Sequence, residues 1–133
     1  MARASWKPWH EVVALREEIK TGALSLNSFA ADLYEVKRGR ARPMYQDPRE
    51  FFALTYPTRN LRDLARDVVF RLAGKNDKAV RQLELTYGGG KTHTLITLLH
   101  LVQDPEGLPD LPAVEEFKVS LDHLTPPKTR VVV

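Results

Sequence analysis

The chain contains no cysteine, so disulfide bonds and zinc sites with cysteine ligands are both excluded. Long apolar runs are missing too. Residues 1–20 lack the continuous apolar core of a signal peptide, and no segment is apolar for long enough to span a bilayer. These absences favour a cytoplasmic location without a membrane partner.

Neither sign of charge is in large excess. The formal net charge is +3 and the isoelectric point is about 9.3. Such a mild excess permits contact with nucleic acid without requiring it. The 133 residues amount to about one domain, and 43% of them are hydrophobic, which is typical of a soluble globular protein rather than a disordered one.

The first half of the chain is expected to be helical. Apolar spacing predicts helices over residues 9–20, 26–36, 48–54 and 61–73. Asp47 is a favoured N-cap, and Pro48 is favoured at the first helical position. Asn60 is the expected cap of the fourth helix, which Gly74 ends.

The second half predicts alternating strands and helices. The expected elements are a strand over 80–87, a glycine loop, a helix over 91–103, a helix near 113–121 and a strand over 129–133. Together they make one β-α-β unit. Two strands are too few for a parallel sheet, so the chain is expected to be the front end of a larger ATPase with an incomplete sheet. Polar residues at 82, 84 and 86 are unusual for a buried central strand.

The expected fold class is therefore α/β. Residues 1–78 are predicted to form a helical N-terminal region. Residues 79–133 are predicted to form the first part of a P-loop nucleotide-binding domain.

The most informative stretch is a glycine run that leads into a helix. Gly88, Gly89 and Gly90 precede Lys91 and Thr92. In a phosphate-binding loop, or Walker A motif, glycines turn backbone N–H groups toward the phosphates, a lysine reaches the outer phosphates and a hydroxyl ligates Mg²⁺. The expected cofactors are ATP and Mg²⁺, with Lys91 as the catalytic residue and Thr92 as the metal ligand.

The match to G-x-x-x-x-G-K-[ST] is incomplete, because Leu85 stands at the first glycine position. The alternative is a glycine-rich turn with an incidental lysine. Hydrolysis also needs an acidic residue at the end of a second strand to hold Mg²⁺. Asp122 is the best candidate, but it lies at the end of an expected helix, so the acid is expected beyond Val133.

Two histidines of the 91–103 helix share one face. His93 and His100 are seven residues apart, or about 10 Å along a helix, which is too far for both to bind one metal ion. His93 either approaches the nucleotide or serves as a packing residue.

Basic and aromatic side chains raise the question of nucleic acid. The candidates for contact with its backbone are Lys37, Arg38, Arg40, Arg42, Arg59, Arg62 and Arg66. Asp63 and Asp67 interleave with the last three, which favours a solvated helix face instead. Trp6 and Trp9 either stack on bases or dock the N-terminal segment onto a core.

Four blocks in order resemble a known family. They are PWHEVV at residues 8–13, SFAADL at 28–33, YQDPREFF at 45–52 and LELTYGGGKTH at 83–93. Together they are similar to the N-terminal region of a family of large predicted AAA-type P-loop ATPases. That family is a domain of unknown function found in prokaryotic anti-phage defence islands beside DNA methyltransferases and helicases.

This resemblance implies a nucleotide-binding stretch composed of Gly88, Gly89, Gly90, Lys91, Thr92 and His93. It also implies a longer full protein, with DNA and defence-system proteins as partners and an oligomer as a candidate assembly. The expected function is the ATP-binding N-terminal portion of an ATPase that couples ATP hydrolysis to remodelling of DNA or protein. Two alternatives stay open: a non-catalytic nucleotide-dependent binding module, and a DNA-binding helical domain with an incidental loop.

Overall fold

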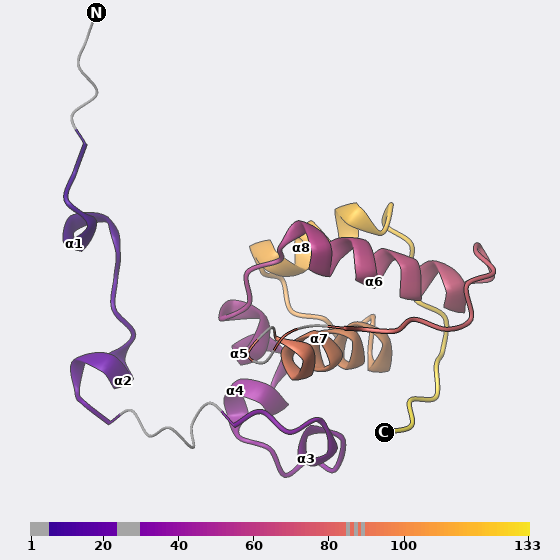
Figure 1. Cartoon of the computed structure of the whole chain (residues 1–133), viewed down its shortest axis with the longest axis horizontal. Coiled ribbons are helices and arrows are strands. Elements are labelled where there is room, and N and C mark those ends of the chain that lie inside the picture. The colour runs from indigo at the N-terminus through magenta and orange to yellow at the C-terminus, as the bar shows by residue number, and fades with distance from the viewer. Residues whose placement is uncertain (1–5, 24–29, 85, 87, 89) are drawn as a thin grey trace, which may run out of the picture. The chain divides into compact units, whose positions relative to one another are not determined.

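The computed structural model describes residues 6–23, 30–84, 86, 88 and 90–133 (Figure 1). The chain divides into two compact units, residues 1–30 and residues 31–133. Helices on both sides of residue 78 belong to the second unit. Each unit is described by itself.

The described part of the first unit holds two one-turn helices, α1 (Trp9–Val12) and α2 (Glu17–Lys20). Val13 is extended between them, so the single helix predicted over residues 9–20 is wrong. Neither helix buries a residue, and Trp6 and Trp9 are 93% and 69% exposed. Isolated helices of this length are marginal in water without packing, which explains the break.

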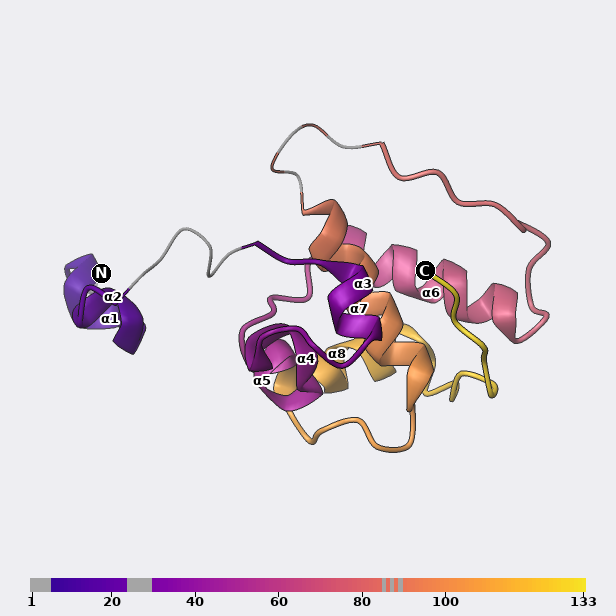
Figure 2. The ribbon, with the colours of Figure 1, turned by 90° about the horizontal axis from the view of Figure 1, so that it is seen from below.

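The second unit contains six helices among its described residues: α3 (Leu33–Lys37), α4 (Pro43–Gln46), α5 (Pro48–Ala53), α6 (Arg59–Leu72), α7 (Lys91–Gln103) and α8 (Pro112–Ser120). Helix α7 packs against α3 and α6, and α8 packs against α5 and α6 (Figures 1 and 2). Their shared core includes Phe51, Phe52, Ala65, Val69, Ile96, Leu101, Val114 and Phe117.

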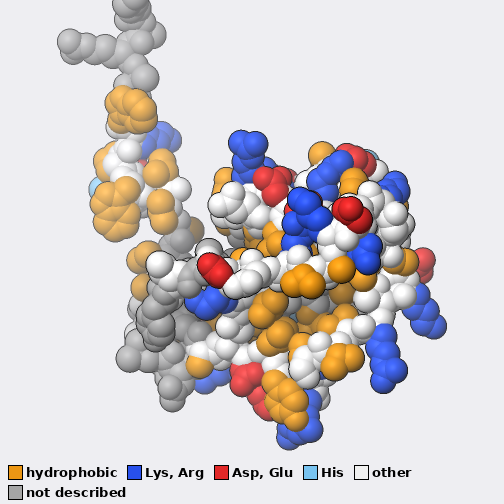
Figure 3. All heavy atoms as spheres, turned by 45° about the vertical axis from the view of Figure 1, so that its right-hand side comes forward, with side chains coloured by type: hydrophobic (Ala, Val, Ile, Leu, Met, Phe, Trp, Pro, Cys, Tyr) orange, Lys and Arg blue, Asp and Glu red, His pale blue; other side chains and the backbone are white. Residues whose placement is uncertain are grey.

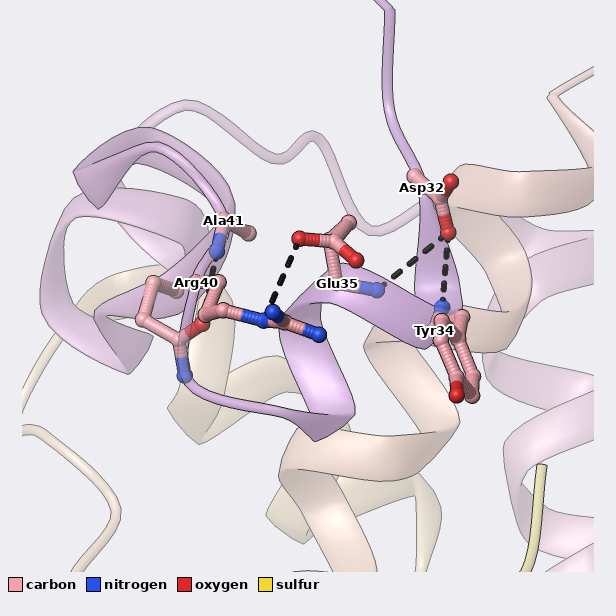
Figure 4. Close-up of polar contacts among 6 residues, drawn as sticks. Asp32, Tyr34, Glu35, Arg40 and Ala41 are labelled. Carbon is pink, nitrogen blue, oxygen red and sulfur yellow. Dashed lines mark hydrogen bonds and ion pairs between the residues drawn. The ribbon is translucent and has the colours of Figure 1, made fainter.

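Side-chain caps begin three of these helices. The Asp32 carboxylate accepts from the backbone N–H of Tyr34 and of Glu35 at the start of α3 (Figure 4). Asp47 caps α5 with Pro48 in the first turn, as predicted. Helix α6 begins earlier than predicted, because the Thr58 hydroxyl, rather than Asn60, accepts from the first turn.

The prediction of an α/β fold with one β-α-β unit is wrong for the residues that the structure describes. Neither residues 80–84 nor residues 129–133 form a strand, and no sheet is present in the described ranges. The reason is visible at Val80, which is 83% exposed. An alternating pattern becomes a strand only if a partner strand takes up its backbone hydrogen bonds, and none does so here.

The two helices predicted in the second half of the chain are present. Helix α7 has the predicted bounds, and α8 begins one residue before the predicted 113 and ends one before 121. Of the helix predicted over 26–36, only its end is present as part of α3, and residues 24–29 lie outside the described ranges.

Replacement of Asp47 tests the capping account. Its Oδ1 accepts from Arg49 N at 2.7 Å and from Glu50 N at 3.1 Å. We expect Asp47→Ala to lower the free energy of unfolding by about 1 kcal/mol and Asp47→Ser to lower it by only a few tenths, because serine is also a good N-cap. Urea unfolding of both variants measures the difference. Equal losses in both would show that the cap contributes nothing.

Candidate functional site

The segment before the glycine loop is tied to helix α6. The chain leaves α6 through Gly74 and returns toward the start of α7 (Figure 2). Asn76 Nδ2 donates to the Asp67 carbonyl at 2.9 Å, and Arg81 Nη2 lies 2.7 Å from Asp67 Oδ2. The second contact is an ion pair without the geometry of a directed hydrogen bond. Residue Asp67 thus anchors both ends of residues 76–81.

The described glycines of the loop both adopt a left-handed backbone. Gly88 and Gly90 each have a φ of 79°, a region that other residues rarely enter. A Cβ at either position would meet no atom within 4 Å, so space beside the loop is open. Leu85, Tyr87 and Gly89 lie outside the described residues.

Gly90 is also the N-cap of α7, and it offers no side-chain acceptor to the first turn. Helix geometry leaves the first amide groups without an acceptor inside the helix. The positive end of the helix dipole lies at the same place. The local electrostatics therefore favour an anion at the start of α7.

The two side chains that follow are placed at this helix end. Lys91 Nζ donates to the Thr86 carbonyl at 3.2 Å, so its ammonium group folds back over the loop. Thr92 is half-buried in the first turn of α7. The structure therefore brings Gly88, Gly90, Lys91 and Thr92 into one turn and its helix.

His93 points away from solvent toward α5. Its ring stacks on Phe51 with centroids 4.6 Å apart and planes at 29°. His93 Nε2 lies 3.1 Å from the Thr55 hydroxyl. The Thr97 hydroxyl donates to the His93 carbonyl at 2.9 Å. Of the two interpretations of His93, packing is the one that these contacts match, although contact with a nucleotide is untested.

His100 also contacts Phe51, the residue on which His93 stacks. Its ring centroid is 5.1 Å from that of Phe51, and its Nε2 donates to the Tyr45 carbonyl at 2.8 Å. Burial lowers the pKa of both histidines below their usual value. For His100, the Tyr45 hydrogen bond and the charge of Asp47 act in the opposite direction.

Two arginines of α6 bind carboxylates near α8. Arg62 pairs with Glu116, while Arg66 donates to the Ser120 carbonyl at 2.6 Å and pairs with Asp122 at 2.7 Å. The hydrogen bond from Arg66 lowers the pKa of the Asp122 carboxyl. The interpretation of α6 as a plain solvated face is incomplete, since these arginines link helices. Asp122, the candidate Mg²⁺ acid, is engaged by this ion pair.

An apolar groove of about 740 Å³ lies on another part of the second unit. Its lining comes from α3, α6, α7 and residues 129–133, and it includes Tyr34, Leu72, Leu95 and Val132. Figure 3 shows hydrophobic side chains gathered around a hollow on one face of the molecule. None of the predicted site residues that the structure describes lines this groove.

The described residues contain no group of three or more His, Asp or Glu side chains placed to hold a metal ion. Among the described helices, none has the length and apolar character needed to cross a bilayer.

Sequence reasoning missed Phe51 and Thr55 as neighbours of the site. Phe51 was expected only as an apolar residue of the third helix. Thr55 had no recognisable signal, because its partner lies 38 residues further along the chain. Covariation between the two positions in aligned sequences is the signal that would indicate such a contact.

The chain matches a known family of domains. A model of the DUF499 N-terminal domain matches residues 9–130, which is almost the entire chain. Searches of curated proteins and of solved structures returned no match.

The two histidines of α7, His100 buried and His93 partly buried, predict a pH dependence of stability. Because their folded-state pKa lies below the ordinary 6.5, the unfolded chain binds more protons at mildly acidic pH. The unfolding free energy is therefore fully retained above about pH 6.5 and falls as the pH drops through that value toward the lowered pKa. Urea unfolding at about pH 7.5 and about pH 5.5 measures this loss.

His100→Gln should reduce the loss of stability between the two pH values. His10→Gln, at an exposed position of α1, is the matched control and should leave the loss unchanged. An identical pH dependence in wild type and His100→Gln would contradict the assignment.

Proposed function

The chain belongs to the family of the DUF499 N-terminal domain, and from that premise we propose that it binds the phosphates of ATP on the loop before α7. The single observation that carries the proposal is the position of Lys91. Its ammonium group folds back to the Thr86 carbonyl across a loop whose described glycines are both left-handed. A lysine held over such a loop neutralises phosphate charge there.

Five residues of the stretch have proposed roles in contact with the ligand. Gly88, Gly89 and Gly90 let backbone N–H groups turn toward the phosphates, and the first turn of α7 adds its amides and its dipole. Lys91 contacts the outer phosphates and is the proposed catalytic residue. Thr92 contributes its hydroxyl to Mg²⁺.

The phosphate chemistry proposed here does not need a sheet. Backbone amides of a left-handed turn and the amino end of a buried helix supply the positive potential by themselves. The open space beside Gly88 and Gly90 suits a ligand that approaches the backbone closely. The absence of a strand among the described residues therefore changes the support of the loop, but the proposal depends only on donor groups of the loop and of α7.

For the larger protein, we extend the proposal to ATP hydrolysis coupled to remodelling of DNA or protein in a defence system. This step rests on the resemblance of the four sequence blocks. A cytoplasmic location, oligomerisation and contact with DNA or defence proteins remain predictions with it.

A second candidate, the non-catalytic nucleotide-dependent binding module, is favoured by the state of Asp122. Its carboxylate is paired with Arg66 at 2.7 Å, so this acid is engaged elsewhere than at Mg²⁺. The two candidates differ in steady phosphate release from ATP, which only the ATPase supports. The DNA-binding alternative is less favoured, because Arg62 and Arg66 bind carboxylates of their own chain.

Replacement of Lys91 tests the proposed site. We expect Lys91→Ala to weaken the binding of Mg²⁺–ATP by about 10- to 100-fold, since a charge-assisted contact is worth about 1.5–3 kcal/mol. Isothermal titration calorimetry on residues 1–133, with ligand to millimolar concentration, measures the affinity. Lys78→Ala, at an exposed position before the loop, is the control and should bind like wild type. Unchanged affinity in Lys91→Ala, or no binding by wild type, would overturn the proposal.

Replacement of Thr92 tests the metal contact. We expect Thr92→Ala to abolish most of the gain in ATP affinity that Mg²⁺ provides, while the affinity measured with EDTA changes less than about twofold. Thr92→Ser keeps the hydroxyl and should retain the gain. Equal losses with and without Mg²⁺ would assign Thr92 a structural role instead.

A further inference from the structure

Helix α5 and the residues just beyond its end contact the start of α7, where Phe51 and Thr55 both approach His93. Thr55, just beyond the end of α5, is buried and approaches His93 Nε2 at 3.1 Å. His93 directly follows Lys91 and Thr92 in the first turn of α7. The contact is therefore made by the residue that directly follows the two side chains proposed to bind phosphate and metal.

The direction of this hydrogen bond follows from a second one. The Thr55 hydroxyl has a single proton, and it donates that proton to the Phe51 carbonyl at 2.7 Å. Toward His93 the same oxygen is left as an acceptor. His93 must therefore carry its proton on Nε2 and donate it to Thr55. The imidazole is fixed in one tautomer and held in one orientation.

Ring stacking fixes the remaining freedom of His93. Phe51 is almost completely buried and lies 4.6 Å from the imidazole centroid at 29°. A ring that is stacked on one residue and hydrogen-bonded to another cannot rotate without loss of both contacts. Two turns further along α7, His100 contacts Phe51 again and donates to the Tyr45 carbonyl. Helix α7 thus contacts α4 and α5 at two positions along its length, His93 and His100.

We propose that Thr55 and His93 are positioning residues for the phosphate loop, and that His93 acts through Thr55 and Phe51 rather than by contact with the nucleotide. The proposal rests on the proposed function of the loop and assigns a role to His93 within it. The link holds the first turn of α7 in the place where the amides, Lys91 and Thr92 face the ligand. Its loss allows that turn to fray, and preorganisation of the site is lost with it.

Paired substitutions at Thr55 test this role. Thr55→Val removes the hydroxyl with little change of shape, whereas Thr55→Ser retains both hydrogen bonds. We expect Thr55→Val to weaken Mg²⁺–ATP binding by residues 1–133 about fivefold, the effect of one lost hydrogen bond, and Thr55→Ser to bind within about twofold of wild type. Calorimetry at a temperature where all variants are folded measures the affinities.

A second measurement follows the helix end without any ligand. The Thr94 amide donates to the Gly90 carbonyl at 2.9 Å and so reports whether the first turn is closed. Its hydrogen exchange should accelerate about fivefold in Thr55→Val and remain at the wild-type rate in Thr55→Ser. Val114→Ala is the matched control, because it removes buried volume from α8 and lowers the melting temperature. It should change neither the affinity nor the Thr94 exchange rate by more than about twofold.

The outcomes separate this inference from the proposed function. If wild type binds Mg²⁺–ATP and Lys91→Ala does not, but Thr55→Val matches Thr55→Ser in both measurements, the loop function stands and the positioning role is wrong. If Val114→Ala weakens binding as much as Thr55→Val at equal loss of melting temperature, the effect is one of general stability and the positioning role is again wrong. If wild type does not bind, the proposed function fails and the positioning role with it.

Discussion

The burial of α7 on more than one side holds the second unit together. Ile96, Leu99, Leu101 and Val102 are buried on this helix, and each contributes about 1.5–3 kcal/mol of transfer free energy. Helices α3 and α6 both pack on it. Because the glycine loop ends at Lys91, a helix that cannot shift gives the loop one fixed end. The proposed phosphate site depends on that rigidity as well as on its own contacts.

Local signals explain which predictions succeeded. Helix α7 was predicted with its exact bounds, because a glycine precedes it and its apolar residues are nearly continuous. The Asp47–Pro48 start of α5 succeeded for the same reason, since cap and first-turn chemistry act within a few residues. The Thr58 cap of α6 was missed because Thr58 and Asn60 are both acceptable caps, and sequence alone does not rank them in place.

The strand predictions failed because a strand depends on a partner far away in the sequence. The alternation over residues 80–84 describes how side chains would face, but it contains no information about which segment supplies the hydrogen bonds. The predicted helix over residues 9–20 failed for a related reason: an apolar face forms a stable helix only when something covers it. For the proposed site, the contiguous loop residues were predicted from sequence, and their role stays a prediction. The contact between Thr55 and His93 was not predicted, because these residues are 38 positions apart in the sequence.

The contacts of Asp67 with Asn76 and Arg81 shorten the connection between α6 and the proposed phosphate loop. The connection from Gly74 to the start of α7 covers residues 74–90, whereas the part that follows the Arg81 ion pair covers residues 81–90. Closure entropy grows with the logarithm of loop length, so the shorter span lowers the cost of ordering by about 0.5 kcal/mol. The Asp67 carboxylate of α6 thus acts on the entropy of the proposed site through Arg81. Natural variation at this position would alter ligand affinity without altering any ligand contact.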